Sequence, residues 1–295
     1  MSDPEHDGGG AEVPGGSRSS MNALERLLSI SPGLRRALVS ETGPGRLLRR
    51  AWYVGPQQCN LCGSWVRFRE SWIGAQLIEY GFPYPIDDFE TLNHSRYLCP
   101  VCRSNDRDRL YKLYIDRFLP PNGVRRVLEF APSTTLSAYL RGRDDLRYRT
   151  ADLMMAGVDD VVDITDMPIY PDGSFDFFMC SHILEHVSDD SLALKELYRI
   201  LAPGGSGIIM TPVMPEGRFD EDPTVTDEAE RWRRFAQGDH VRLYDRSTLC
   251  SRIKQSGLEL SLLDRNTFGD KTFKRHAIAL GSVLYVVRRP TTDAA

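Results

Sequence analysis

The stretch that decides the fold is residues 175–211, which read FDFFMCSHILEHVSDDSLALKELYRILAPGGSGIIMT. Its first residues are mostly apolar, which predicts a buried strand over 175–180. Leucines then recur at helical spacing, which predicts an amphipathic helix over 189–201 that ends at the Pro-Gly-Gly turn 203–205. Another apolar run predicts a strand over 207–211. A strand, a helix and a strand in this order indicate a crossover between parallel strands.

The same alternation continues on both sides of this stretch. Further apolar runs predict strands, and residues 247–255 predict a second helix. Because several crossovers precede a final hairpin, we expect an α/β fold. Its seven-stranded sheet should be mostly parallel, with an antiparallel last strand at the edge. The remaining predicted strands are 126–130, 148–152, 158–163, 258–263 and 282–287.

Four parts of the chain differ in pattern. Residues 1–20 are acidic and then rich in Gly and Ser, which predicts a disordered tail. Residues 21–55 predict a helical segment that is interrupted at 31–33 and at 42–45, where Gly and Pro cluster. The other two parts are a four-cysteine module at 56–123 and the strand and helix pattern at 124–290, with an insertion at 213–244.

The composition is that of a globular protein. The 295 residues are 41% hydrophobic and 26% charged, with a formal net charge of -4. A protein dedicated to nucleic acid would usually be basic, so this charge argues against one. No apolar run approaches the ~18 residues that span a membrane, and the N-terminus lacks the apolar core of a secretion signal. We therefore expect a cytoplasmic protein with reduced thiols and no membrane partner.

Four of the cysteines form two Cys-x-x-Cys pairs, Cys59 with Cys62 and Cys99 with Cys102. Each pair can present two sulfurs on one tight turn, and zinc favours four thiolates in a tetrahedron. Disulfides are the alternative, disfavoured in a reducing compartment, and four ordinary buried thiols would rarely pair this way. We expect a closed, structural zinc site in a zinc-ribbon-like module, with residues 68–97 forming a hairpin or lid.

Acidic residues stand at the ends of three successive predicted strands, at Glu129, Asp152 and Asp163. Ligands of open α/β sheets bind outside the carboxyl ends of the strands. A carboxylate about 20 residues beyond the first turn commonly accepts both hydroxyl hydrogens of a ribose. Asp152 stands at such a distance from Glu129. A solvated strand end is the alternative for any single acid, but three in succession favour a cofactor site.

Four segments resemble the successive motifs of class I S-adenosylmethionine-dependent methyltransferases, in order and spacing. The resemblance implies a Rossmann-like sheet, S-adenosylmethionine as cofactor, and transfer of its methyl group. The chain also resembles a subgroup of these proteins that has Ala-Pro in the first turn and two cysteine pairs upstream. The segments are VLEFAPSTTL (127–136), YRTADL (148–153), VDITDMPIYPDGSFDFFMCSHILEHVSDD (162–190) and ELYRILAPGGSGIIMTPV (196–213).

The resemblance also implies which residues contact the cofactor. Asp152 is expected at the ribose hydroxyls and Glu129 at the amino-acid end. The first turn, residues 129–133, departs from the family because it contains no glycine, and Pro132 removes a backbone donor. A domain that no longer binds cofactor is therefore an alternative. The other expected contacts are Asp163 and Ile164 at the adenine, Ser181 and His182 beside the sulfonium, and Ala131 and Leu153 along the same site.

A cluster of polar residues occupies 237–244, where this fold usually carries its substrate loop. We expect His240 to act as the base or substrate anchor, Asp239 to orient it, and Arg242 to hold the loop or an anionic group. His182 is a further candidate catalytic residue, and His186, one helical turn beyond it, is more often a packing residue than a base in such a position. A structural alternative is that Asp239 pairs with Arg242 while His240 caps the following helix region.

The acceptor is expected to be a small-molecule metabolite that is methylated on a hydroxyl or an amine. Residues 212–234 should form a mobile cover over it, with the aromatic segment 68–97 as the opposite wall. The Asn/Asp-Pro-Pro-aromatic motif of amine methylation on adenine or glutamine is absent after the fourth strand. Nucleic acid is therefore not the expected partner, and the sequence does not indicate an oligomeric state.

Two alternatives to this function stay open. One is an RNA base methyltransferase, because some of these carry an N-terminal zinc module. The other is a non-catalytic partner subunit with a methyltransferase-like fold, which the glycine-free first turn suggests. For the RNA alternative, a phosphate-binding stripe could be formed by Arg103, Arg107, Arg109, Arg125 and Arg126.

Overall fold

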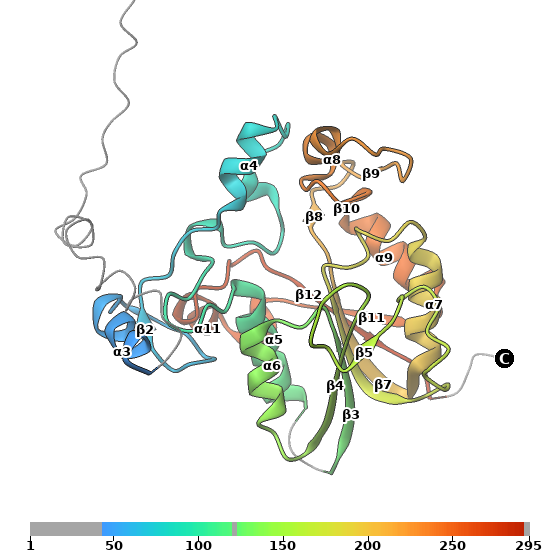
Figure 1. Ribbon diagram of the computed structural model, residues 1–295, viewed down its shortest axis with the longest axis horizontal. Helices are drawn as coiled ribbons and strands as arrows, with labels where there is room; N and C mark the ends of the chain where they lie inside the picture. Colours follow the sequence, from blue (N-terminus) through green and yellow to red (C-terminus); the bar gives the residue numbers. More distant parts are fainter. Residues whose placement is uncertain (1–42, 120–122, 292–295) are drawn as a thin grey trace, which may run out of the picture. The chain divides into compact units, whose positions relative to one another are not determined.

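The computed structural model of the protein describes residues 43–119 and 123–291 (Figure 1). The chain divides into two compact units, Met1–Arg49 and Arg50–Ala295. The predicted tail, and the predicted helical segment up to residue 42, lie outside the described residues. Helix α3 (Gly43–Trp52) begins inside the stretch 42–45, where the sequence predicted an interruption of the helical segment. Pro44 is tolerated in the first turn of α3 because no intrahelical bond needs its N–H.

The second unit contains a seven-stranded sheet with the order β11-β12-β7-β6-β3-β4-β5 (Figure 1). All strands are parallel except β12, which is antiparallel to both of its neighbours. The α/β class and the antiparallel last strand are therefore confirmed. The strands are β3 (Arg125–Phe130), β4 (Leu146–Asp152), β5 (Asp160–Val161), β6 (Phe175–Ser181), β7 (Leu201–Met210), β11 (Glu259–Leu263) and β12 (Leu284–Arg288).

The predicted position of the antiparallel strand is wrong, because β12 lies between β7 and β11 and the edge strand is β11. Leu284, Tyr285 and Val287 of β12 are fully buried, which an edge position would not allow. Two short helices, α10 (Arg265–Phe268) and α11 (Asp270–Arg275), connect β11 to β12.

Two predicted boundaries also differ. The Pro-Gly-Gly sequence 203–205 does not form a separate turn after the helix but lies inside β7, which follows α7 (Asp190–Ile200) directly. A register shift between β6 and β7 accommodates it: Phe175 pairs with Leu201, but Phe177 pairs with Ser206. Strand β5 is shorter than predicted, because the chain turns at 163–166.

The helices that cover the sheet begin at side-chain caps. Figure 1 shows α5 (Asp106–Phe118) and α6 (Thr134–Arg141) on one side of the sheet, and α7 and α9 (Arg246–Gln255) on the other. Asn105 and Asp108 form a reciprocal capping box on α5. Ser133, Asp189 and Asp245 each accept a hydrogen bond from the first turn of α6, α7 and α9, respectively.

The cysteine module contains a small antiparallel ladder of β1 (Gln57–Gln58) and β2 (Trp65–Val66). Of the hairpin or lid predicted between the cysteine pairs, the hairpin is not formed. That segment instead carries α4 (Ile73–Glu79) and two 3₁₀ turns, η1 (Ile86–Asp88) and η2 (His94–Arg96). Its aromatic residues explain the difference, because Phe82 and Phe89 pack in one apolar cluster with Trp232 and Phe235 of α8 (Glu228–Phe235).

The insertion 213–244 also has regular structure. It contains α8 and contributes to a three-stranded sheet of β8 (Val213–Met214), β10 (Arg242–Asp245) and β9 (Asp220–Glu221). Among the described residues, no helix combines the length and the apolar character that crossing a membrane requires.

Candidate functional site

The first turn after β3 adopts a conformation that usually favours glycine. Ala131 has a φ of 46°, in the left-handed region. Its side chain is a single methyl group, which is the smallest addition to glycine. The steric strain of this backbone conformation is therefore small for a residue other than glycine. Ser133 then begins α6 by accepting a hydrogen bond from the N–H of Leu136. The absence of glycine therefore leaves the turn from strand to helix intact.

The sheet register brings the expected cofactor residues to one edge. Phe130 on β3 pairs with Ala151 on β4 and with Cys180 on β6. The next residues along these three strands are Ala131, Asp152 and Ser181, so they lie side by side at the carboxyl ends. The tertiary structure thus assembles three residues that are far apart in the sequence.

Glu129 is a buried carboxylate just below this edge. The hydroxyl of Tyr148 donates a hydrogen bond to its Oε2. Burial raises the pKa of Glu129 to about 7, and the hydrogen bond from Tyr148 opposes that rise. A cationic group beside Glu129 would stabilise its ionised form, as an amino group of a cofactor would.

Asp152 closes a turn at the end of β4. Its Oδ1 accepts hydrogen bonds from the N–H groups of Met154 and Met155, both at 2.7 Å. In the described part of the chain, Oδ2 takes no hydrogen bond, which leaves it free for a hydroxyl donor. Leu153 and Met154 beside it are exposed. Exposed apolar side chains next to a carboxylate suit a nucleoside, which offers a flat ring and a diol.

The other expected cofactor residues differ in whether their side chains can reach a ligand. Asp163 is exposed and bonds through Oδ1 to the N–H of Thr165 at 2.8 Å. The side chain of Ile164 is buried in the main core, so only its backbone could reach a ligand. The hydroxyl of Ser181 lies 2.6 Å from the hydroxyl of Tyr111 on α5.

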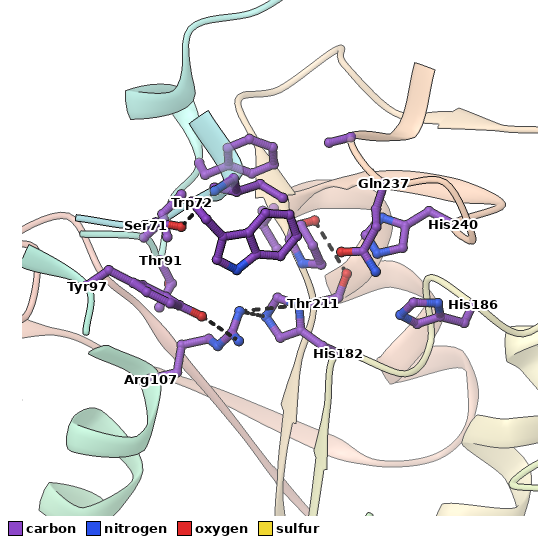
Figure 2. Close-up of a pocket in the computed structure, with 16 residues that line it drawn as sticks. Ser71, Trp72, Thr91, Tyr97, Arg107, His182, His186, Thr211, Gln237 and His240 are labelled. Carbon is purple, nitrogen blue, oxygen red and sulfur yellow. Dashed lines mark hydrogen bonds between the residues drawn. The ribbon is translucent and has the colours of Figure 1, made fainter. Parts of the chain in front are cut away.

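A cavity of about 320 Å³ adjoins the ends of β6 and β7 (Figure 2). One wall comes from the aromatic segment of the cysteine module, as predicted, and the other from the loop before β10. Its volume is in the range of small-ligand pockets. The residues labelled in Figure 2 that line it are Ser71, Trp72, Thr91, Tyr97, Arg107, His182, His186, Thr211, Gln237 and His240.

His182 follows β6 with a φ of 57° and contacts Arg107. Nη1 of Arg107 lies 2.5 Å from Nε2 of His182, and Nη2 donates to the hydroxyl of Tyr97 at 3.3 Å. Because a guanidinium can only donate, Nε2 of His182 accepts and its proton is on Nδ1. Burial, reinforced by Arg107, lowers the pKa of His182. His182 is therefore a neutral imidazole whose Nε2 is already engaged.

His240 is buried, and its Nδ1 lies 2.9 Å from the carbonyl oxygen of Phe235. Nδ1 therefore donates, and Nε2 keeps its lone pair. Burial lowers the pKa of His240 to about 4, so the ring is neutral near pH 7. The rings of His240 and His186 are perpendicular, with centroids 4.6 Å apart.

The expected contact between Asp239 and His240 is not formed in the described structure. Oδ2 of Asp239 instead lies 3.2 Å from Nδ1 of His186. The side chain of Asp239 is largely exposed, whereas that of His240 turns inward, so the two neighbours face opposite ways. The alternative pairing of Asp239 with Arg242 is not found among the described residues either.

Arg242 holds the loop that follows β6, as one of the predicted roles required. It is buried and donates to the backbone carbonyls of Leu184, Val187 and Ser188. Its Nε bonds to Glu221 at 2.5 Å. Arg242 is thereby saturated inside the protein and not placed to bind an anion. The loop it fixes carries Glu185 and His186.

The sequence interpretation missed Glu185 as a site residue, did not favour His186 as one, and placed Arg107 on the surface. His186 was expected to be a packing residue, and Arg107 part of a surface stripe. The sequence feature that could have identified them is the Glu185-His186 pair shortly after the predicted strand 175–180, whose carboxyl end lies at the expected cofactor site. The partner His240 could not be assigned from that signal, because it belongs to a distant loop.

The four cysteine sulfurs of the module lie within 4.8 Å of one another. Sγ of Cys59 is 3.6 Å from Sγ of Cys102, and Sγ of Cys62 is 3.9 Å from Sγ of Cys99. Tetrahedral zinc with Zn–S bonds of ~2.3 Å requires S–S separations of ~3.8 Å. These residues therefore fit a zinc ion, and four thiolates would leave it no open position.

Each cysteine pair is shaped by a tight turn of the same kind. The N–H of Gly63 donates to the carbonyl of Cys59, and the N–H of Arg103 donates to the carbonyl of Cys99. Gly63 and Arg103 both have left-handed φ angles, of 71° and 64°. The two turns repeat one geometry, which presents two sulfurs from each side.

Three of the five arginines proposed as a phosphate-binding stripe do not share one surface. Arg109 is fully buried and donates to five backbone carbonyls, while its guanidinium covers the ring of Phe68 at 4.1 Å. Arg107 faces the cavity. Arg126 pairs with Asp176 at 2.7 Å. The alternative of RNA recognition loses one of its two supports and keeps the other, the predicted zinc module.

A parallel sheet with one antiparallel strand next to the edge, and acids at the carboxyl ends of its strands, is the fold of class I S-adenosylmethionine-dependent methyltransferases. The profile of the family described as methyltransferase domain matches residues 104–263, more than half of the chain. The chain therefore belongs to this methyltransferase family.

Similar proteins match shorter segments. Ajmaline N-methyltransferase of Rauvolfia serpentina is 43% identical over 54 residues, which cover 18% of each chain. The ubiquinone/menaquinone biosynthesis C-methyltransferase UbiE of Pseudoalteromonas translucida is 30% identical over 115 residues, 34% of this chain and 45% of that protein. The chain thus spans less than half the length of these relatives. A putative methyltransferase from Bacillus halodurans has a similar structure, with a TM-score of 0.42, 17% identity, and coverage of 62% of this chain and 99% of that one.

Proposed function

We propose that this protein transfers a methyl group from S-adenosylmethionine to a hydroxyl or amine of a small molecule bound in the cavity of Figure 2. The observation that carries the proposal is the position of this cavity. It is lined by His182, the residue directly after the strand end at which Ala131, Asp152 and Ser181 meet. A cofactor held at that edge would direct its methyl group toward the cavity.

The chain has suitable groups for each part of the cofactor. Glu129 would pair with the amino group, Asp152 would accept from the ribose hydroxyls, and Leu153 would pack beside the adenine. S-adenosylmethionine supplies an activated methyl group on a sulfonium, so the protein's task is mainly to position the acceptor and exclude water. Trp72 and Tyr97 enclose the acceptor side of the cavity.

A small acceptor fits the enclosed cavity better than a nucleic acid. The walls come from the cysteine module and from the insertion, and three of the five arginines of the alternative phosphate-binding stripe are buried, at the cavity or paired with an acid. Both relatives are named for methyl transfer, one to nitrogen of ajmaline and one to carbon in quinone biosynthesis. Their names differ in the atom methylated, so they support a small acceptor rather than a particular atom.

We propose a structural zinc ion for the four cysteines. The four thiolates would hold it in a closed tetrahedron, with no role in methyl transfer. Zinc would fix the module that carries one wall of the cavity.

Calorimetry with S-adenosylmethionine and with S-adenosylhomocysteine tests cofactor binding by the zinc-loaded protein. We expect one site per chain. Absence of binding would contradict the enzyme proposal and favour a non-catalytic partner subunit. Transfer of a radiolabelled methyl group to pooled hydroxylated and amine metabolites, compared with total RNA, then tests the acceptor class. Labelling of RNA alone would overturn the small-molecule proposal.

A further inference from the structure

One carboxylate and two imidazoles come together beside the cavity, from Glu185, His186 and His240. One ligand atom from each lies within 4.8 Å of the other two. Glu185 and His186 come from the loop after β6, and His240 comes from the loop before β10. Two imidazoles and one carboxylate are a common donor set for divalent first-row transition metals.

The two imidazoles are oriented as metal ligands usually are. A ligating histidine normally donates its second ring N–H to a carboxylate or a backbone carbonyl, which fixes the tautomer and the ring. Nδ1 of His186 lies 3.2 Å from Oδ2 of Asp239, and Nδ1 of His240 lies 2.9 Å from the carbonyl of Phe235. In both histidines a hydrogen-bond acceptor faces Nδ1 and fixes the ring. Nε2 of each is therefore available to bind an ion.

Glu185 is a fully buried carboxylate with one close polar neighbour. Its Oε1 lies 3.0 Å from Nδ1 of His182, the ring nitrogen that carries the proton. Its Oε2 takes no hydrogen bond from the described residues. Burying a carboxylate with one oxygen unpaired is costly. A cation between Glu185 and the two histidines would remove that cost.

The cluster is open on the side of the cavity, since His186 and His240 both line it (Figure 2). Three protein ligands leave coordination positions free for a substrate, unlike the closed cysteine site. We propose that Glu185, His186 and His240 bind a divalent transition-metal ion whose open positions take an oxygen of the methyl acceptor. The role of the acceptor oxygen rests on the proposed methyltransferase function, whereas the metal site does not.

This site narrows the acceptor to molecules with a hydroxyl that can bind a metal. Binding would lower the pKa of the hydroxyl, which would lose its proton to water in the cavity. The oxygen lone pair then attacks the methyl carbon, forming an O–C bond as the S–C bond breaks. The bonding electrons remain on sulfur, giving S-adenosylhomocysteine and the methyl ether.

Metal binding by the full-length chain tests the proposal directly. The zinc-loaded protein would be treated briefly with EDTA to remove weakly bound ions, desalted and assayed to verify that the cysteine zinc is retained. It would then be titrated with Mn²⁺, using the electron paramagnetic resonance signal of free Mn²⁺, and with Co²⁺ by calorimetry. We expect about one additional ion per chain. S-adenosylmethionine binding would be measured on the same samples. A protein that binds the cofactor but neither ion overturns the metal site and leaves the proposed function intact. A protein that binds an ion but no cofactor supports the metal site and contradicts the proposed function.

Variants locate the site. Glu185→Gln and His240→Gln should each weaken Mn²⁺ binding at least about tenfold. The matched control is His94→Gln, because His94 lies outside the cavity lining and should not change Mn²⁺ affinity. Zinc content and cofactor affinity should stay unchanged in folded variants. Unaltered Mn²⁺ affinity in both site variants would place the ion elsewhere and overturn the assignment. If a site variant does not fold, the stoichiometry of the wild-type protein still decides whether the site exists.

Discussion

Oδ2 of Asp239 lies 3.2 Å from Nδ1 of His186, whereas the imidazole of the adjacent His240 turns inward to the carbonyl of Phe235. Asp239 thus joins the loop before β10 to the loop after β6. Arg242, the first residue of β10, also contacts the loop after β6, because it donates hydrogen bonds to the carbonyls of Leu184 and Val187. Both contacts fix the position of His186 at the cavity.

Asp239→Asn should weaken Mn²⁺ binding at the proposed site about tenfold, because a neutral amide orients and polarises His186 less strongly than a carboxylate. Calorimetric affinity for S-adenosylmethionine should not change. Asp270→Asn is the control, since Asp270 is exposed and lies on α11. Equal Mn²⁺ affinities for the two variants would show that Asp239 has no positioning role.

Asp152→Ala should weaken S-adenosylmethionine binding by a factor of about 10 to 100 or abolish it, because hydrogen bonds to a charged group contribute about 1.5–3 kcal/mol. Zinc content should remain that of the wild-type protein. Asp176→Ala provides a comparison at the opposite end of the sheet, where Asp176 pairs with Arg126. Normal cofactor binding by Asp152→Ala would mean that the ribose is not held at the end of β4.

The raised pKa of Glu129 predicts that cofactor affinity depends on pH. Its pKa of about 7 means that it is largely protonated below pH 7 in the free protein. Pairing with a cationic amino group requires the ionised form, so affinity for S-adenosylmethionine should fall as pH decreases from 8 to 6. At pH values well below the pKa of Glu129, the affinity should fall about tenfold for each further pH unit.

Glu129→Gln should bind the cofactor more weakly at pH 8, and its affinity should vary little from pH 8 to 6. The amide can still accept from Tyr148, so the fold should be retained. A wild-type affinity that is constant over this range would contradict the role given to Glu129. Calorimetry at several pH values measures both proteins.

Cys99→Ser should lose zinc and destabilise the protein by about 4 kcal/mol or more, which is the scale that follows loss of a metal site. Cys250→Ser should retain zinc, because Cys250 lies on α9, outside the four-sulfur cluster. Metal analysis and thermal unfolding compare the two variants. A zinc-free wild-type protein that is fully folded would refute the zinc site.

The sequence by itself determined the class of fold and predicted the edge of the sheet at which a cofactor would bind. Local spacing of apolar residues is enough to predict a strand or a helix, because each element buries one of its own faces. The strand-end acids Glu129 and Asp152 could be located in the same way, since a parallel sheet gathers the carboxyl ends of its strands at one edge. The first turn kept its shape without glycine, through Ala131.

Only the tertiary structure decided which distant segments meet. The pairing of β12 between β7 and β11 depends on strand contacts that no local pattern encodes. Register also decided that the Pro-Gly-Gly segment lies inside β7. The approach of His240 to Glu185 and His186 depends on how two loops pack. The orientation of the Asp239 side chain decided that it contacts His186 and not His240. The stretch 175–211 thus carries the fold, while the chemistry of the cavity arises from residues that folding brings to its edge.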